Sequence, residues 1–416
     1  MIYLSIGSNL GNRFENLTRA VDSLNFFKNL QCSIVLETTC IVPNGAPPEW
    51  NVPFLNMIVW GECDLAPEEL LINLKQIEHE IGRQKFYEKW APRVIDLDIL
   101  FMDGVSLNTP TLTIPHPEIN NRPFFQHLLA LVNPLQYHFK QPKECFLKSF
   151  VLSPKLVGIV NVTPDSFSDG GKYFSADLAI SQALELANNG AAIIELGGQS
   201  TRPGAEMLTS EQEYARLKPV LDGLSEYMAR GEIRISIDSF CADVIAKILE
   251  NYPIAWANDV KGDLDDATLS TIAGNNCGIV LMHSLSVPPK KDLTIDHKLN
   301  PVEVVRDWAI LKIARLQALG FEPDAIIIDP GIGFGKSAYQ DIWLIRSMEV
   351  LKNLGCKIMA GHSRKSFMTV FTNEPASNRD LETIAASAVL KNKADYLRVH
   401  NVADHMRFLV AQNCLR

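Results

Sequence analysis

Two carboxylates stand two positions apart in PRVIDLDILF, the stretch from Pro92 to Phe101. The odd positions from Ile95 to Phe101 are all apolar, as in a strand that packs one face against a core. The opposite face carries Asp96 and Asp98, which a strand holds about 7 Å apart. Like charges at this distance repel, so the pair predicts a bound cation. By spacing alone, two solvated acids on an edge strand are the better interpretation.

A second group of polar residues follows short apolar runs in the rest of the chain. These residues are Asn161, Gln199 to Arg202, Asp238, Asn258 with Asp259, His283, Asp329, Ser363 to Lys365, and Arg398 with His400. A single such residue is usually a helix cap or a satisfied loop. Eight sets that meet at one end of a barrel are hard to assign to stability. Their carboxylates and amides suit a polar heterocycle, and their Arg, Lys and His side chains suit an anion.

The elements that must position these residues form two predicted domains and a linker, residues 1–138, 155–416 and 139–154. In the first domain the patterns predict an α+β unit, with helices over Phe14 to Phe27 and Pro67 to Ile81, and strands over Ile2 to Ile6, Ser33 to Thr39, Asn56 to Glu62 and Arg93 to Phe101. The sequence from His138 to Pro154 has no regular apolar pattern and contains several lysines, so we expect the boundary between the two domains there.

The second domain alternates short apolar strands with helices. Its strands are expected over Leu156 to Val162, Ala192 to Leu196, Ile233 to Ile237, Ile254 to Ala257, Gly278 to Met282, Ala325 to Ile328, Lys357 to Ala360 and Tyr396 to Val399. Eight such units in roughly 260 residues are typical of a TIM (β/α)8 barrel, whose active site lies at the carboxyl ends of its strands. The run DPGIGFGKS lacks one glycine of an ATP-binding Walker A loop, so its glycines predict tight turns instead.

Length, charge and cysteine content limit the number of domains, the kinds of partner and the cellular compartment. The chain of 416 residues is too long for one ordinary domain, and its net charge of -9 argues against nucleic acid and anionic membrane as partners. Its eight cysteines are scattered without any C-x-x-C, which indicates free thiols in a reducing compartment. No signal peptide or membrane-spanning run is found, so we expect a cytoplasmic protein.

The motifs of the second domain resemble those of dihydropteroate synthase. They are VGIVNVTPDSFSDGG, LGGQSTRPG, SIDS, AND, IDPGIGFGK, GHSRKS and LRVHNV, spread from Val157 to Val402 in the order of that family. The departures are Gln199, where an acid is common, and Ile332, where an aromatic residue is common. The resemblance implies that 4-aminobenzoate condenses with the pyrophosphate ester of a hydroxymethyl dihydropterin.

The same resemblance implies the roles of individual residues. The pterin would be bound by Asp238, Asn258, Asp329, Phe334 and Lys365. Catalysis would involve Lys365, Arg398 and His400, the last two at the pyrophosphate. Asn161 would bind the Mg²⁺ of that pyrophosphate, since phosphate-bound Mg²⁺ takes few protein oxygens. The aminobenzoate pocket would consist of Phe167, Thr201, Arg202, Pro203 and Ser366.

The first domain resembles hydroxymethyl-dihydropterin pyrophosphokinase, a ferredoxin-like fold. The matching motifs are GSNLGNR, FLNMIV, GRQKFYEKWAPRVIDLDIL and IPHPEINNRPF. The resemblance implies that Asp96 and Asp98 hold Mg²⁺ with ATP, and that Arg83 and Arg93 neutralise charge during phosphoryl transfer. It further implies ATP contacts by Lys85, Trp90, His116 and Arg122, and pterin contacts by Asn44, Phe54, Asn56 and Phe124.

Two departures and two alternatives stay open at this point. Thr111 stands where a basic ATP contact is expected, and the first domain ends early. One alternative is the pterin-binding domain of corrinoid methyltransferases, which would not require LRVH or SRKS. The other is a first domain that has lost catalysis and serves as a scaffold. Synthases of this family are typically dimers, so a homodimer through the barrel domain is open as well.

Overall fold

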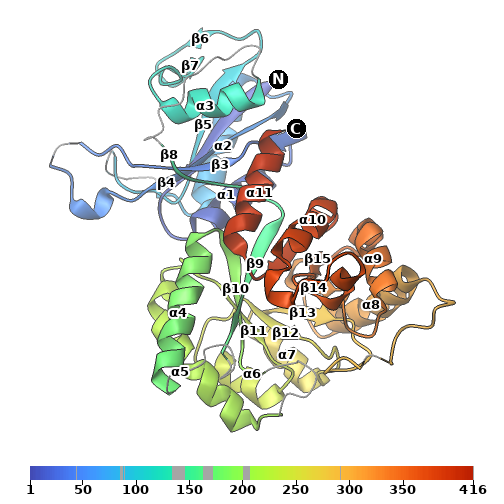
Figure 1. The fold of residues 1–416 in the computed structure, drawn as a ribbon. Helices are drawn as coiled ribbons and strands as arrows, with labels where there is room; N and C mark the ends of the chain where they lie inside the picture. The colour runs from blue at the N-terminus through green and yellow to red at the C-terminus, as the bar shows by residue number, and fades with distance from the viewer. Residues whose placement is uncertain are drawn as a thin grey trace. The chain divides into compact units, whose positions relative to one another are not determined.

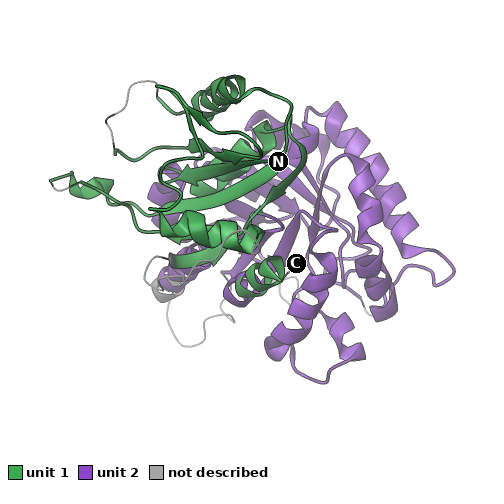
Figure 2. Ribbon diagram, turned by 90° about the horizontal axis from the view of Figure 1, so that it is seen from above, with its two compact units in different colours: residues 1–152, 407–416 green, residues 153–406 purple. Residues whose placement is uncertain are grey.

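The computed structural model describes residues 1–43, 45–84, 88, 90–133, 146–162, 172–199, 207–290 and 292–415. The chain divides into two compact units, which Figure 2 distinguishes by colour. Unit 1 comprises Met1–Leu152 with Arg407–Arg416, and unit 2 comprises Ser153–Met406. No helix in these described ranges is long and apolar enough to cross a membrane.

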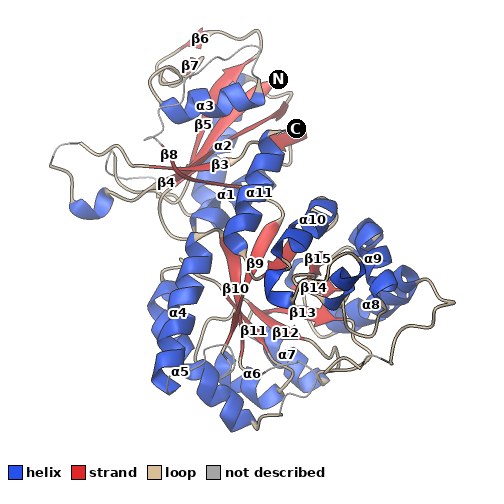
Figure 3. Cartoon of the chain, in the orientation of Figure 1, coloured by secondary structure: helices blue, strands red, loops and turns tan. Residues whose placement is uncertain are grey.

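Unit 1 is built on an antiparallel sheet with the strand order β5-β1-β4-β3-β8, and β2 also pairs with β4. These strands are β1 (Ile2–Ser8), β2 (Lys28–Cys32), β3 (Val35–Thr38), β4 (Phe54–Glu62), β5 (Asp96–Met102) and β8 (Phe146–Phe150). Its other elements are α1 (Arg13–Ser23), α2 (Pro67–Ile81), α3 (Pro123–Val132), the one-turn helix η1 (Pro48–Trp50) and the small ribbon of β6 (Leu107–Asn108) and β7 (Thr113–Ile114). Figure 3 shows the strands in red and the helices in blue. The α+β expectation is confirmed.

Local sequence explains the bounds of the helix α2. Pro67 occupies its first turn, where a missing N–H costs nothing, and Gly82 ends it in the left-handed region with φ 118°. Leu70, Leu74 and Ile77 bury one stripe between these two ends. The predicted helix over Pro67 to Ile81 therefore agrees with the structure.

Three expectations about unit 1 differ from the structure. The helix expected over Phe14 to Phe27 is α1, which ends at Ser23. The strand β5 begins at Asp96 rather than Arg93, because the Arg93 backbone N–H donates to the Asn9 side-chain oxygen (2.8 Å) instead of entering the sheet. The predicted linker contains β8, whose residues pair with β3, Ser149 opposite Leu36 and Phe150 opposite Val35. The strand β2 was not expected, because its mostly exposed sequence KNLQC has no apolar alternation.

Unit 2 is a closed parallel barrel, as predicted. Its strand order is β10-β11-β12-β13-β14-β15-β16-β9, and β16 pairs with β9 to close the ring. The strands are β9 (Lys155–Asn161), β10 (Ala191–Gly197), β11 (Ile235–Asp238), β12 (Trp256–Asp259), β13 (Gly278–Met282), β14 (Ile326–Asp329), β15 (Lys357–Ala360) and β16 (Tyr396–Val399). Inward side chains pack a core layer inside the barrel: Val157, Ile193, Trp256, Val280, Ile327 and Met359.

Helices follow the strands around the barrel (Figure 1). They are α4 (Lys172–Asn188), α5 (Ser210–Ala229), α6 (Ala242–Leu249), α7 (Asp266–Gly274), α8 (Pro301–Ala318), α9 (Ala338–Arg346), α10 (Asp380–Leu390) and α11 (Val402–Cys414), with short 3₁₀ turns η4 (Pro323–Ala325), η5 (Met348–Leu354), η6 (Ser366–Val370) and η7 (Ala376–Asn378). Several are capped by their own sequence. Thr209 and Ser337, for example, form capping boxes with Gln212 and Gln340.

Candidate active sites

The aspartates of the DLD motif lie on one face of β5 beside the first strand of the sheet. Asp96 pairs with Gly7 and Asp98 with Ser5 in the register of β5 on β1. Both carboxylates line a cavity of about 150 Å³. Its lining residues are Ser5, Gly7, Thr38, Thr39, Cys40, Ile41, Phe54, Asn56, Trp90, Arg93, Asp96, Asp98, Arg122, Pro123 and Phe124. The acids therefore belong to a pocket and not to a solvated edge.

Two arginines hold Asp96 as a carboxylate. Arg83 Nη1 lies 2.5 Å from Asp96 Oδ1, and Arg93 Nη1 lies 3.4 Å from Asp96 Oδ2. Burial by itself would raise the pKa of Asp96, but the charges of Arg93 and Arg83 outweigh it and lower that pKa. The buried Glu78 fixes Arg83 in turn, with Oε2 2.8 Å from Arg83 Nη1 and Oε1 accepting from the Leu97 N–H (2.8 Å).

Asp98 has the opposite electrostatic surroundings. Burial, reinforced by the charge of Asp96, raises the pKa of Asp98. Among the described residues, no ion pair involves Asp98. Arg93 Nε is also buried there and has no hydrogen-bond acceptor within the part of the chain that the structure describes. A cation beside Asp98 and an anion beside Arg93 would satisfy both groups.

Aromatic and amide side chains form the other side of this cavity. Asn56 donates from Nδ2 to Thr38 Oγ1 (2.8 Å), and the Arg93 guanidinium lies 5.5 Å from the centre of the Phe54 ring. Gly7 admits these side chains, because a methyl group there would come within 2.9 Å of Asn56 Oδ1. The predicted pterin residues Phe54, Asn56 and Phe124 thus share one pocket.

The predicted ATP residues fall into three groups. Trp90 and Arg122 line the cavity, and the Trp90 side chain is 39% exposed. His116 does not line it, but its Nδ1 accepts from the Glu118 N–H (3.2 Å) and its pKa is lowered by burial, against the opposing charge of Asp98. Lys85, and the predicted pterin residue Asn44, lie outside the described residues. Thr111 is exposed beside Thr109, 3.4 Å between their hydroxyl oxygens.

In unit 2, three strand ends present buried oxygen atoms that accept no hydrogen bond from a described residue. Asp238 Oδ1, Asn258 Oδ1 and Asp329 Oδ2 are buried oxygen atoms without a hydrogen bond from any described residue. Asp238 and Asp329 are the last residues of β11 and β14, and Asn258 is the next-to-last residue of β12, so all three lie at the same end of the barrel. Burial, and then the charge of Glu195, raise the pKa of Asp238 to about 8. Such a set suits a ligand that brings several N–H donors.

A network of buried charged side chains contacts the residues that carry these acceptors. Arg398 Nη1 lies 3.2 Å from Glu195 Oε1, and its Nη2 lies 3.2 Å from Asp329 Oδ2. Glu195 Oε2 accepts from Asn258 Nδ2 (3.0 Å), so the amide nitrogen of Asn258 is satisfied while its oxygen accepts no hydrogen bond from a described residue. Gly361 makes room for Arg398, since a methyl group at this glycine would come within 2.6 Å of Nη2. Glu195 was not predicted, because its place inside the apolar run IIELG resembles a strand interior.

Lys365 and His400 complete the ring of polar groups. The Lys365 ammonium lies 4.2 Å from the centre of the Phe334 ring, and burial followed by the charge of Arg398 lowers the pKa of Lys365 to about 8. His400 Nδ1 lies 2.9 Å from Ser363 Oγ. Asn161 ends β9 near Gly197, where a methyl group would be 3.6 Å from Asn161 Oδ1 and 3.8 Å from Asp238.

The loop after β14 is held by a lysine that sequence reasoning did not assign. Gly331, Gly333 and Gly335 all have positive φ, so the predicted tight turns are confirmed. Lys336 Nζ donates to the carbonyls of His283, Gly331 and Phe334 at 2.9 to 3.0 Å, and its Nζ lies 2.7 Å from His283 Nδ1. Burial lowers the pKa of Lys336 to about 7 and that of His283 to about 3.

Two protein families match the two units. The family described as 7,8-dihydro-6-hydroxymethylpterin-pyrophosphokinase (HPPK) matches residues 3–134, and the family described as pterin binding enzyme matches residues 157–400. A relative named folate synthesis bifunctional protein, from Chlamydia caviae, is 39% identical over 99% of this chain and 97% of its own length. The chain belongs to the bifunctional folate synthesis proteins. Unit 1 carries its pyrophosphokinase domain and unit 2 its dihydropteroate synthase domain.

Other members and solved structures agree with this membership. The folate synthesis bifunctional protein of Arabidopsis thaliana is 31% identical over 97% of this chain and 94% of its own length. The dihydropteroate synthase of Xanthomonas albilineans with 4-aminobenzoic acid has a TM-score of 0.57 and 32% identity, over 63% of this chain and 93% of its own. That of Anaplasma phagocytophilum, with bound 6-hydroxymethylpterin-monophosphate, has a TM-score of 0.56 and 30% identity, over 63% and 98%.

Membership in the bifunctional folate synthesis family confirms the predicted pairing of activities. The structure brings together the predicted residues Asp96, Asp98, Arg93, Phe54 and Phe124 in the pyrophosphokinase domain. In the synthase domain, Ser366 is exposed directly after Lys365, at the start of η6. The other predicted aminobenzoate residues, Phe167, Thr201, Arg202 and Pro203, lie outside the described residues.

Proposed function

We propose how this bifunctional enzyme divides its two reactions among its residues. The first domain moves pyrophosphate from ATP to the hydroxyl group of 6-hydroxymethyl-7,8-dihydropterin and releases AMP. The barrel then condenses this ester with 4-aminobenzoate, giving 7,8-dihydropteroate and pyrophosphate. The single observation that carries the residue assignment is the set of three buried oxygens at the barrel mouth that accept no hydrogen bond from a described residue, and only that of Asp329 has an ion-pair partner, Arg398. Such acceptors match the donor edge of an aminopyrimidine.

In the pyrophosphokinase domain the pterin binds between Phe54 and Phe124, with Asn56 at its polar edge. Gly7 supports this placement, because it leaves room for the Asn56 and Phe54 side chains. Arg83 and Arg93 stabilise the negative charge that grows on the phosphates as the pterin hydroxyl attacks the β-phosphorus. Trp90, His116, Arg122 and Lys85 bind ATP, and Asn44 contacts the pterin, as the family motif implies.

The donor set of this domain fits Mg²⁺. Asp96 and Asp98 are hard oxygen ligands on one strand face, and Mg²⁺ in nucleotide sites takes one or two carboxylates with phosphates and waters. The raised pKa of Asp98 supports a missing positive charge beside it. When bound, the ion would neutralise phosphate charge. Asp96 is kept ionised by its arginines and orients toward the same cavity.

In the synthase domain, Asp238, Asn258, Asp329 and Lys365 bind the pterin, and Phe334 packs beside the Lys365 ammonium. Arg398 and His400 bind the pyrophosphate that leaves, and Asn161 is the amide ligand for its Mg²⁺. Charge stabilisation on the leaving group matters more than a base, because the amine of aminobenzoate is already nucleophilic. Phe167, Thr201, Arg202, Pro203 and Ser366 form the aminobenzoate pocket.

Three further assignments belong to the proposal. The catalytic segments are residues 1–138 and 155–416, joined by 139–154. The described cysteines are all free thiols, which supports a reducing, cytoplasmic setting. Exposed apolar side chains on α8 and α9, Ile310, Leu311, Tyr339 and Trp343, support a homodimer through the barrel.

One experiment tests both halves together. The purified chain is mixed with hydroxymethyl dihydropterin, ATP, Mg²⁺ and 4-aminobenzoate, and AMP and dihydropteroate are measured. We expect dihydropteroate without any added kinase. The double variant Asp96→Asn with Asp98→Asn should lose AMP formation by at least about 100-fold, because both oxygen ligands lose their charge. Normal AMP formation by this variant would refute the metal role, and absence of pyrophosphate release by the wild type would refute the synthase role.

A further inference from the structure

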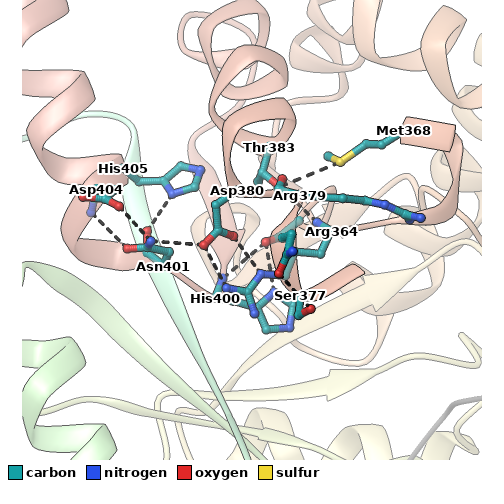
Figure 4. Close-up of polar contacts among 12 residues, drawn as sticks. Arg364, Met368, Ser377, Arg379, Asp380, Thr383, His400, Asn401, Asp404 and His405 are labelled. Atoms are coloured by element: carbon teal, nitrogen blue, oxygen red, sulfur yellow. Dashed lines mark hydrogen bonds and ion pairs between the residues drawn. The ribbon is translucent and has the colours of Figure 1, made fainter. Parts of the chain in front are cut away.

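One carboxylate connects the two loops that carry Lys365 and His400. Asp380, the first residue of α10, accepts two hydrogen bonds from Arg364, Nε to Oδ1 at 2.7 Å and Nη2 to Oδ2 at 2.9 Å. Its Oδ2 also accepts from Asn401 Nδ2 at 3.1 Å. Figure 4 shows Asp380 between Arg364 on one side and Asn401 on the other. Arg364 belongs to the loop after β15, and Asn401 belongs to the loop after β16.

The loop after β15 is fixed by the start of α10 at two consecutive residues, Arg364 and Lys365. Arg364 has φ 58°, a left-handed conformation that is strained for a non-glycine residue and therefore needs support. Its backbone N–H donates to Thr383 Oγ1 (3.1 Å), and Arg379 Nη1 donates to the Lys365 carbonyl (3.3 Å). The turn at Arg364 places the neighbouring Ser363 and Lys365 at the barrel mouth.

The loop after β16 is fixed in the same way. Asn401 caps α11 by accepting the Asp404 N–H (3.1 Å), and its Nδ2 is shared between Asp380 and Asp404 Oδ2 (2.9 Å). His405 Nδ1 lies 2.6 Å from the Asn401 carbonyl. Asn401 directly follows His400, whose ring contacts Ser363 Oγ. The two loops therefore meet twice, once through Ser363 and His400 and once through Asp380.

We propose that Asp380 is a positioning residue for the synthase reaction: it sets the Lys365 and His400 side chains relative to each other through Arg364 and Asn401. This inference rests on the proposed roles of Lys365 and His400. Asp380 itself bonds to Arg364 and Asn401 rather than to Lys365 or His400, so it holds these two residues through their neighbours. Burial lowers the pKa of His400, and the charge of Asp380 acts against that shift. Displacements of about 1 Å at a reacting group can cost about 100-fold in rate, which is enough for a measurable effect.

The test compares three single variants of the full-length protein in dihydropteroate formation from supplied pterin pyrophosphate. Asp380→Asn removes the charge that Arg364 binds, and Asp380→Glu keeps it on a longer side chain. Glu382→Gln is the matched control, because it removes one acid from the same helical turn, and no described residue forms a hydrogen bond to Glu382 Oε2. AMP formation by unit 1 is measured in the same samples and should not change.

We expect Asp380→Asn to lower kcat/KM for the pterin pyrophosphate by about tenfold or more and to weaken product inhibition by pyrophosphate, since Lys365 and His400 both move. Asp380→Glu should restore part of this loss, and Glu382→Gln should stay within about twofold of the wild type. Arg364→Lys should resemble Asp380→Asn, and the double variant should be no worse than either single one, because both remove one interaction.

Two outcomes would overturn the inference. In the first, Asp380→Asn lowers the melting temperature but leaves kcat/KM and pyrophosphate inhibition per folded molecule unchanged, as for a merely structural residue. In the second, the effects of Asp380→Asn and Arg364→Lys add in full. A wild-type protein that forms no dihydropteroate would instead refute the proposed function itself.

Discussion

At the scale of single residues, neighbouring acids have pKa values shifted in opposite directions because their surroundings differ. Arg83 and Arg93 lower the pKa of Asp96, whereas burial raises the pKa of Asp98 two residues away. In the barrel, Asp238 and Glu195 both have raised pKa values, caused first by burial and opposed by Arg398. Each site thus keeps charges that the folded protein alone does not fully satisfy, as binding sites for charged and polar ligands do.

Asp238→Asn should make the barrel more stable at high pH. In the folded chain the pKa of Asp238 is about 8, against 3.8 for an ordinary aspartate. The folded state therefore keeps a proton that the unfolded state loses, so wild-type stability falls as the pH rises from about 4 to 8. Asparagine does not titrate. We expect the melting temperature of the variant, relative to the wild type, to rise by roughly 5 °C between pH 5 and pH 8.

A scanning-calorimetry series across this pH range measures the effect, together with dihydropteroate formation, which the variant should lose. A difference in melting temperature that is the same at every pH would contradict the assigned pKa.

At the scale of elements, close approaches between strand ends decide which side chains can enter the barrel mouth. Gly361, just after β15, lies against the Arg398 guanidinium of β16. Gly331, after β14, has φ 69° and lies against the His283 carbonyl. Pairing between β8 and β3 likewise extends the first sheet with a segment that has no catalytic motif. These elements carry no reacting group, yet they fix the positions of groups that do.

Gly361→Ala should damage the synthase selectively. A methyl group at this position would come within 2.6 Å of Arg398 Nη2 and 3.0 Å of Asp329 Oδ2, so both side chains must shift. We expect dihydropteroate formation to fall by about tenfold or more, and AMP formation to stay at the wild-type rate. Gly274→Ala in α7 is the control, since a methyl group there meets nothing within 4 Å. Equal rates for the Gly361 variant and this control would show that Arg398 does not depend on the glycine.

At the scale of the whole molecule, the described residues assigned to each site come from a single unit. The described pyrophosphokinase residues lie in Met1–Leu152, and the described synthase residues lie in Ser153–Met406. We therefore expect each domain of the chain to catalyse its reaction independently of the other.

The two activities should be separable by mutation. Lys365→Ala should lower dihydropteroate formation from supplied ester by at least about 100-fold, because the pterin and the leaving group lose a cation, and AMP formation should be unaffected. Asp96→Asn with Asp98→Asn should do the reverse. Each reaction is measured with its own supplied substrate, so that one does not limit the other. Loss of both activities in either variant would show that the domains depend on each other.

The sequence by itself determined the order of domains, the eight barrel strands and most residues at their ends. Its signals are local: apolar periodicity fixes strands such as Gly278 to Met282, and dense motifs such as SRKS and DLD mark the chemistry. Helix limits were predictable where caps are strong, as at Pro67 and Gly82. The edge strand β2 was not, because its exposed sequence has no alternation.

Only the tertiary structure decided which residues support the reacting ones. Glu195 lies 203 positions from Arg398 in the chain, and Lys336 lies 53 from His283, so no local pattern could pair them. In the sequence, Asp380 is an ordinary acidic residue at the start of a helix. Only the fold brings it into contact with both Arg364 and Asn401. Burial is the physical reason: a charge inside the protein must find its partner wherever the fold brings one, and that partner is set by packing and not by sequence distance.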